Sequence, residues 1–259
     1  SDIFLSAIEK VKSNNSVEIL TNSTVSQVSG IAGDFNIAFK QDGTLVEKPF
    51  GAVVVTSDLK ISDYKAAYGL KGAENVISIH ELEEMILSLK ESDKGKTIAF
   101  LLGLKKETNP LEFARVLALV KELQKFDCKA YIFTNNIKLT AFNLDQEYYD
   151  TRNEGAVYVK SAEEPEFSID KNSLKIVYVD SALQRKVELS PDMIVVDQKY
   201  AADDTNSDLS EKFGINLSSN RFLQAENIRN IPTRTNQKGI FAIGSGKQIQ
   251  GLNESLTDI

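Results

Sequence analysis

The sequence predicts an α/β fold, because short apolar runs alternate with segments whose apolar residues recur at the spacing of one helix face. Residues 97–102, TIAFLL, and residues 129–134, KAYIFT, are each predicted to be buried strands. Between them, residues 111–125 carry an apolar helix face that begins after Asn109-Pro110. A strand, a helix and a strand over this length form a βαβ unit with parallel strands.

The first 58 residues predict a different, partly antiparallel arrangement. Residues 2–13 have a helical apolar period, and residues 17–20 form a short apolar run typical of a strand. Residues 24–29, 35–39 and 45–48 then predict a small meander, whose second turn is the hairpin signal Asp42-Gly43. Residues 51–55, GAVVV, predict a buried strand.

The remaining elements surround the βαβ unit in the chain. Residues 60–75 have a mixed composition and are predicted to be a connection, and residues 78–92 predict an amphipathic helix. The later part predicts a helix, a strand, a hairpin, a buried strand and a short helix stopped by Gly214. In order, these lie at residues 144–153, 156–159, 174–180 with 187–189, 193–196 and 207–213.

Composition excludes several classes of function. The 259 residues carry a net charge of −7, which argues against nucleic acid as a partner, because phosphate binding needs a basic surface. No apolar run approaches the roughly 18 residues that span a bilayer, and we see no signal peptide. With one cysteine, Cys128, the chain makes no internal disulfide and no cysteine-rich metal cage, so we expect a cytoplasmic protein.

His80, the single histidine, is the residue that a serine or cysteine nucleophile would need as its base. It lies in a predicted first helical turn with Glu81, Glu83 and Glu84 close by, and we expect it to be a surface residue. No paired carboxylates stand out as a general acid and base, and we therefore predict no catalytic residue and no metal site.

The turn after residue 102 is the place to test for a dinucleotide. A dinucleotide fold has Gly-x-Gly-x-x-Gly there and an acidic residue after the next strand. The chain has Gly103 alone, and Asn135-Asn136 follow the second strand. Conventional NAD binding is therefore not expected. Lys105, Lys106 and Arg115 are available to meet a phosphate, although exposed cations of this kind are usually solvated.

The last residues carry a second glycine turn. Ile240-Phe241-Ala242-Ile243 is a short apolar run, and Gly244-Ser245-Gly246 follows at once. Asn253, Glu254 and Ser255 then resemble a helix start. A strand, a glycine turn and a helix N-terminus together can bind an anion, because free N–H groups and the helix dipole favour negative charge. On spacing alone, a tight turn without a ligand is an equal alternative.

The residue types in this stretch identify a family more specifically than the spacing of its glycines does. "T-N-x-x-G-I-F-A-I-G" resembles the final strand of the FAD domain in flavoproteins with two dinucleotide domains. The following "K-Q-I-Q-G-L-N-E-S-L" is most similar to the group of heterodisulfide reductase A-like proteins, within the FAD-dependent pyridine nucleotide–disulfide oxidoreductases. The phrase "V-E-I-L-T-N-S-T-V-S-Q-V-S-G" near the start is similar to the meander of the same FAD domain.

This resemblance implies a cofactor, a set of partners and a set of site residues. The cofactor would be FAD, and the partners would be iron–sulfur or other redox subunits of a complex; a homo-oligomer is left open. The implied cofactor-binding residues all lie after the last strand. They are Gly244, Ser245, Gly246, Lys247, Gln248, Asn253, Glu254 and Ser255.

The chain also departs from this family. No Gly-x-Gly-x-x-Gly loop precedes Asp2, so we expect a fragment or a shortened relative that binds FAD weakly or not at all. Ser57-Asp58 stand where relatives have glycine, and Ser245 replaces the acidic residue of a Gly-Asp pair. The places where relatives carry cysteines hold Leu102, Glu112, Val116 and Leu117.

The predicted fold is therefore a Rossmann-like, NAD(P)-binding-type domain inserted into a partial FAD-type domain with a small antiparallel meander. We place the FAD-type part at residues 1–58 and 220–259 and the inserted domain at residues 59–219. The resemblance implies a part of an FAD-dependent, heterodisulfide reductase A-like oxidoreductase that passes electrons through flavin. The alternative is a non-catalytic Rossmann-like scaffold or interaction module that has lost cofactor binding. A small-molecule-binding protein of this fold unrelated to flavin is a third interpretation.

Overall fold

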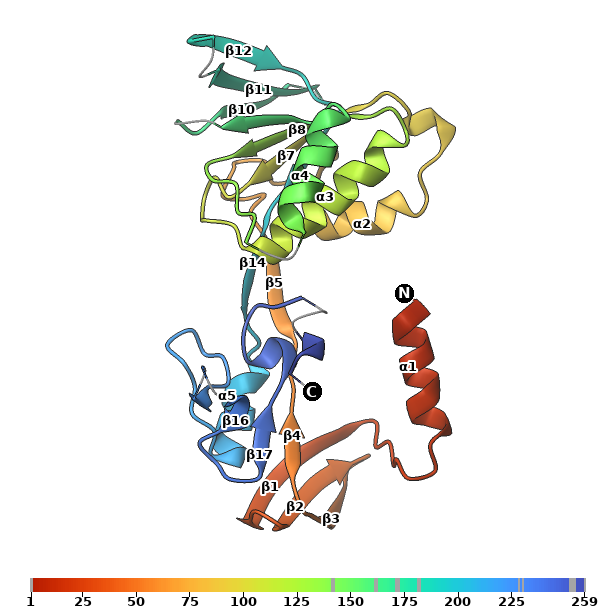
Figure 1. The fold of residues 1–259 in the computed structure, drawn as a ribbon, viewed down its shortest axis with the longest axis vertical. Helices are drawn as coiled ribbons and strands as arrows, with labels where there is room; N and C mark the ends of the chain where they lie inside the picture. The colour runs from red at the N-terminus through yellow and green to blue at the C-terminus, as the bar shows by residue number, and fades with distance from the viewer. Residues whose placement is uncertain are drawn as a thin grey trace. The chain divides into compact units, whose positions relative to one another are not determined.

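The chain folds into two compact units, of which the second is inserted into the first (Figure 1). Unit 1 consists of Ser1–Leu59 and Ala202–Ile259, and unit 2 of Lys60–Ala201. The expected α/β fold, with one domain inserted into another, is confirmed. The computed structural model describes residues 2–140, 143–160, 163–170, 173–180, 183–227, 229, 231–251 and 255–258.

Unit 2 is built on a parallel sheet of five strands in the order β6-β13-β7-β8-β9. The sequences of the central β7 and its neighbour β13 are short and almost wholly apolar, as expected for parallel strands covered on both faces. In chain order the five strands are β6 (Val76–Ser78), β7 (Thr97–Leu102), β8 (Lys129–Thr134), β9 (Val157–Lys160) and β13 (Met193–Val196).

Three helices cover one face of this sheet and gather on one side of unit 2 in Figure 1. They are α2 (Ile79–Ile86), α3 (Pro110–Gln124) and α4 (Leu144–Asn153). Phe113 and Val120 of α3 pack with Phe100 of β7 and Ile132 of β8 in one apolar core. Helix α3 begins where the sequence predicts, since the Asn109 side chain accepts a hydrogen bond from the Glu112 N–H and Pro110 occupies the first turn.

Helix α2 is shorter than predicted. Ser78 and Glu81 form a capping box at its start, but the helix ends at Ile86 rather than at residue 92. Leu87, the next residue, is 90% exposed, so no apolar packing supports a longer helix there. A turn of 3-10 helix, η1 (Glu91–Asp93), follows before β7.

The opposite face of the sheet is covered by an antiparallel meander. It comprises β10 (Glu166–Asp170), β11 (Ser173–Asp180) and β12 (Arg185–Leu189). Ile176 and Tyr178 of β11 pack with Leu101 of β7 and Phe133 of β8. The sequence predicts the β11–β12 hairpin, but β10 is not predicted. Two further strands, β5 (Leu59–Asp63) and β14 (Gln198–Ala202), pair with each other, and β5 lies in a segment that the sequence predicts to be a connection.

Unit 1 contains two sheets with a core between them. One is the predicted meander, β1 (Ser23–Ile31), β2 (Asp34–Gln41) and β3 (Thr44–Phe50). The other has the order β15-β16-β17-β4, with β4 (Val53–Val55), β15 (Ala225–Asn227), β16 (Ile231–Thr235) and β17 (Ile240–Ala242). Phe35 and Ile37 of β2 pack with Val55 and Ile240 in this core. The predicted helix over residues 2–13 is α1 (Asp2–Ser13).

The chain returns to unit 1 earlier than predicted. Unit 1 resumes at Ala202, whereas the sequence places this boundary at residue 220. The reason is helix α5 (Thr205–Phe213), which ends at Gly214 in a left-handed conformation (φ +67°). Phe213 and the following Ile215 are buried in the core of unit 1, so α5 belongs to that unit.

Two strand predictions in unit 1 need correction. Residues 17–20 form no strand, and Val17 and Ile19 are 43% and 50% exposed, so this apolar run lacks a neighbouring strand and a core. The run of residues 51–55 is a strand only over its three valines, and the central Val54 is 59% exposed while Val55 is buried. Strand β4 therefore contributes one face to the core and leaves the other exposed.

Two glycines of the β1–β2 hairpin give a direct test of this packing. Gly30 and Gly33 have nearly equal φ angles of +92° and +91°. A Cβ atom on Gly30 would lie 2.1 Å from the Asp34 carbonyl oxygen, whereas nothing lies within 4 Å of one on Gly33. We expect Gly30→Ala to lower the free energy of unfolding by about 2–4 kcal/mol and Gly33→Ala by about 1 kcal/mol, since only the first adds a clash to the backbone strain. Urea unfolding followed by circular dichroism measures both losses, and equal losses would contradict the hairpin geometry.

Candidate functional site

The carboxyl edge of the unit 2 sheet holds the polar groups that a functional site of this fold would use. From β7 the chain runs to β8 and β9 on one side, while β13 lies on the other side of β7. Ligands of open parallel sheets bind at such a switch point, beyond the carboxyl ends of the strands. Gly103 follows β7 and Asp197 follows β13, so these two residues occupy that position.

Asp197 is the central group of this edge. Its side chain is almost wholly buried, with the residue 1% exposed. One carboxylate oxygen accepts a hydrogen bond of 2.8 Å from the Gly103 N–H, and the other accepts one of 3.0 Å from the Tyr68 hydroxyl. Burial raises the pKa of Asp197 to about 6, although these hydrogen bonds favour the charged form.

Gly103 has the conformation that such a turn requires. Its φ angle is +74°, and a Cβ atom there would lie 3.1 Å from the backbone nitrogen of Thr108. The N–H that a dinucleotide phosphate would use at this place is already bound to Asp197. A second donor near the turn is the Asn135 side chain, which is directed to the carbonyl oxygen of Gly103 at 3.4 Å.

Glu112 supplies a second buried carboxylate, at the start of α3. It is 2% exposed and lies in the first helical turn, the place that favours negative charge. Its oxygens accept hydrogen bonds from the Gln198 N–H at 2.5 Å and from the Thr108 hydroxyl at 3.1 Å. Burial, with a further contribution from the charge of Asp197, raises the pKa of Glu112 to about 7.

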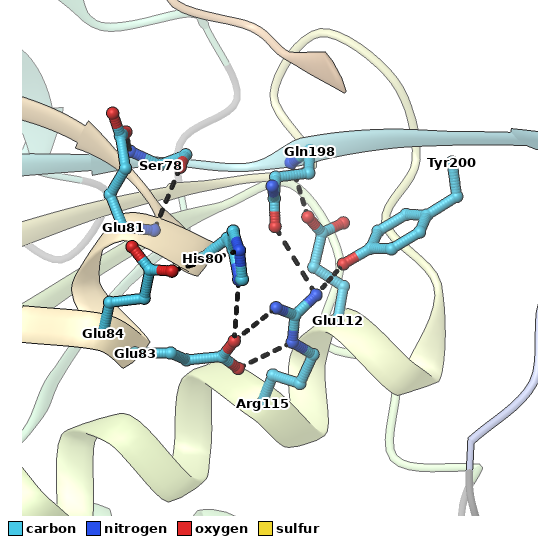
Figure 2. A network of polar contacts seen from close by, with 9 residues as sticks. All are labelled: Ser78, His80, Glu81, Glu83, Glu84, Glu112, Arg115, Gln198 and Tyr200. Atoms are coloured by element: carbon cyan, nitrogen blue, oxygen red, sulfur yellow. Dashed lines mark hydrogen bonds and ion pairs between the residues drawn. The ribbon is translucent and has the colours of Figure 1, made fainter. Parts of the chain in front are cut away.

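Figure 2 shows that Arg115, a predicted phosphate contact, lies within a network of its own chain. Its guanidinium donates two hydrogen bonds to Glu83, of 2.7 Å and 2.5 Å, and further ones to Gln198 and to the Tyr200 hydroxyl. The pair with Glu83 neutralises the positive charge, so Arg115 has little left to attract a phosphate.

The other residues of unit 2 that the sequence singled out are exposed or form ion pairs within the chain. Lys105 forms an ion pair of 2.5 Å with Glu164 and lies 5.5 Å from the centre of the Tyr68 ring. Lys106 is exposed. His80 is the second residue of α2, its side chain is 62% exposed, and it lies 3.7 Å from both Glu83 and Glu84 (Figure 2). It is thus the surface histidine that the sequence predicts.

The carboxyl edge of the unit 2 sheet holds two buried acids, Glu112 and Asp197. Two carboxyl groups with pKa values near 6 and 7 have the acidity of a general acid or base. Both side chains are enclosed, however, and their oxygens hold backbone N–H groups and hydroxyls of the same chain. A proton carrier must reach the reacting atom, whereas these carboxylate oxygens contact groups of the chain itself.

In unit 1, the predicted site around Gly244 also meets a carboxylate of its own chain. Gly244 follows β17 with a φ angle of +66° and opens a turn of 3-10 helix, η2 (Gly244–Gly246). Its N–H donates a hydrogen bond of 2.9 Å to Asp258. Lys247 forms an ion pair with the same carboxylate, and the Gln250 amide donates to it at 2.8 Å.

The other predicted residues of this site are held by structural contacts or lie apart. The Gly246 carbonyl oxygen accepts hydrogen bonds from the Leu223 N–H and the Asn206 side chain. Gln248 and Ser255 both contact Gln250, at 2.8 Å and 3.1 Å. Ser245 is half-buried. Asn253 and Glu254 lie outside the described residues.

FAD, which the resemblance implies, does not fit these residues as the structure has them. The N–H of Gly244 and the ammonium of Lys247 are the donors that a cofactor phosphate would need, and Asp258 occupies both. Ser57, which replaces the usual glycine, packs so closely that a Cβ atom on Gly246 would lie 2.6 Å from its hydroxyl. Its hydroxyl also donates to the Asn206 side chain.

Sequence reasoning missed the three residues that define these places, namely Glu112 as a buried acid, Asp197 and Asp258. A signal was present for two of them. Asp197 directly follows the all-apolar strand of residues 193–196, and Glu112 lies three residues after the helix-capping Asn109. Among the described residues, no group of three His, Cys, Asp or Glu side chains could hold a metal ion. Likewise, no described helix is long and apolar enough to cross a membrane.

The buried acid pair predicts how stability depends on pH. Glu112 and Asp197 have ordinary pKa values of 4.5 and 3.8, and both are raised in the folded protein. Between pH about 4.5 and 7 the folded state therefore binds more protons than the unfolded state, and the free energy of unfolding falls as pH rises. We expect a fall of about 4 kcal/mol between pH 5 and pH 8.

Glu112→Gln should remove a large part of this dependence, because an amide keeps one of the two hydrogen-bond acceptors and carries no charge. Chemical unfolding at a series of pH values measures the slope. The matched control is Glu84→Gln, which removes an exposed carboxylate of α2. Equal slopes for the wild type and both variants would contradict the role of the buried pair.

The comparisons with known proteins bear on the fold. No family model matches the chain, and no curated protein sequence matches it. Solved structures do match. The crystal structure of T. acidophilum thioredoxin reductase is 14% identical, with a TM-score of 0.58 over 99% of this chain and 76% of that one. Thioredoxin reductase from Lactococcus lactis is also 14% identical, with a TM-score of 0.53 over 91% of this chain and 70% of that one.

A NAD-dependent persulfide reductase from A. fulgidus is 15% identical, with a TM-score of 0.51 over 90% of this chain. This chain spans 40% of that protein. At such identities the likeness shows the fold alone. The chain therefore shares the α/β fold of these thioredoxin reductases and of the persulfide reductase, and its chemistry must be argued from its own residues.

Proposed function

We propose that this chain is a non-catalytic interaction module, built on the fold of the flavin-dependent disulfide oxidoreductases, whose nucleotide-type unit has lost cofactor binding. The observation that carries this proposal is the hydrogen bond from the Gly103 N–H to the buried Asp197 carboxylate. The donor that would hold a cofactor phosphate is used inside the protein, and the group that uses it is itself negatively charged.

Electrostatics support the same conclusion. A dinucleotide phosphate at this edge would lie beside the buried Asp197 carboxylate. Like charges at close range in a poorly solvated place repel each other strongly. The nearby cations Lys105 and Arg115 are already paired with Glu164 and Glu83, and do not offset this repulsion.

The second candidate is the one that the resemblance implies, a part of a heterodisulfide reductase A-like oxidoreductase that transfers electrons through FAD. The fold likeness over nearly the whole chain and the Gly244 turn after β17 favour it. In this candidate, FAD belongs to a larger parent, iron–sulfur or other redox subunits are the partners, and the complex is cytoplasmic. The module would then be the part that docks against those subunits.

One experiment tests whether this chain binds a cofactor by itself. The purified chain is passed through a gel-filtration column before and after incubation with FAD, and its absorbance spectrum is recorded. We expect no flavin bands in the protein peak in either case, because the donors of both glycine turns are occupied. When NADH is added to the same sample, the NADH fluorescence should likewise stay unchanged.

A flavin-dependent disulfide reductase taken through the same column is the positive control. Flavin bands that stay with this chain through gel filtration would contradict the proposed module and favour the electron-transfer candidate. Saturable NADH binding would contradict the assignment of unit 2 as a unit that has lost its cofactor.

A further inference from the structure

The Gly244 turn of unit 1 forms a cradle of three donors around one carboxylate. The N–H of Gly244 and the Gln250 amide donate to the same oxygen of Asp258, at 2.9 Å and 2.8 Å. The ammonium of Lys247 contacts the other oxygen. A backbone N–H, an amide and an ammonium converging on two oxygens is the arrangement by which proteins hold oxyanions.

Burial makes this contact more than a surface ion pair. The side chains of Lys247 and Asp258 are 8% and 6% exposed. Burial by itself would raise the pKa of Asp258, but the hydrogen bonds from Lys247, Gln250 and Gly244 outweigh it and hold the pKa below its ordinary value. Asp258 is therefore charged at neutral pH, and the cradle holds a true anion, which the chain itself provides.

A small cavity borders Lys247, one of the three donor residues, and is not lined by Gly244, Gln250 or Asp258. Lys247 and Gln248 line this cavity of about 180 Å³ together with apolar side chains that include Leu223, Ala225 and Pro232. Binding sites for drug-sized ligands and cofactors have volumes of roughly 300 Å³ and above. A phosphate or a short carboxylate fits this volume, whereas a dinucleotide does not.

We infer that the Gly244 turn is an oxyanion site that Asp258 keeps closed, so that a small phosphate or carboxylate binds there when the Asp258 carboxylate is removed. This inference concerns unit 1, whereas the proposed function stands on Asp197 in unit 2. The two therefore fail separately: saturable NADH binding by the wild-type chain overturns the loss of cofactor binding in unit 2, and the variants below decide the inference.

The test compares the binding of inorganic pyrophosphate by the wild type and by Asp258→Ala. Titration calorimetry gives the affinity, and the amide signal of Gly244 in a nitrogen–proton correlation spectrum gives the place. We expect Asp258→Ala to bind pyrophosphate at least tenfold more tightly than the wild type and to shift the Gly244 signal on binding. Adding Lys247→Met to this variant should abolish the gain.

The matched control is Asp208→Ala, which removes the same charge from unit 1 at an exposed pair with Lys212. This control distinguishes a gain in pyrophosphate affinity at the Gly244 turn from a gain that any loss of negative charge would cause. Asp258→Asn, which keeps the size of the side chain, provides the test if Asp258→Ala fails to fold. A folded Asp258 variant with the pyrophosphate affinity of the wild type, or a gain equal to that of Asp208→Ala, would overturn the inference.

Discussion

A buried carboxylate must be given hydrogen-bond donors, and the rest of unit 2 is arranged around that requirement for Asp197. Its donors come from Gly103, at the end of β7, and from Tyr68, in the segment that precedes β6. The carboxylate thus links the neighbouring strands β7 and β13 to a third segment at their carboxyl edge. Loss of one donor would leave a buried charge partly unpaired, which costs more than the hydrogen bond contributes.

The fold of unit 2 does not depend on which groups lie at this edge of the sheet. The two apolar cores of unit 2 lie on the faces of the sheet and are built from side chains such as Phe113, Phe100 and Ile176. The carboxyl edge is a separate place, at the ends of the strands. The groups at this edge can therefore differ while the cores, and with them the fold, stay unchanged.

The sequence was sufficient for the elements that apolar periodicity determines, and it was insufficient where tertiary packing decides. Helix α4 and strands β7 and β8 lie at their predicted residues because local pattern and burial agree there. Residues 17–20 have the composition of a strand, but strand formation needs a neighbour, and Ile19 is half exposed. The acidic site residues were missed for the same reason: whether Asp197 is solvated or enclosed depends on Tyr68, 129 positions away in the chain.

The affinity of the wild-type chain for an anion differs from the intrinsic affinity of the donors at the Gly244 turn, because Asp258 occupies them. Asp258 is tethered to the cradle by a short stretch of its own chain, so its local concentration there is on the order of millimolar or more. An external anion must compete with this tethered carboxylate, which the fold already holds in place. Weak binding by the wild type therefore says little about the cradle itself. The donors around Asp258 are fixed by the turn whether or not a ligand uses them, and their affinity becomes measurable only once the tethered carboxylate is gone.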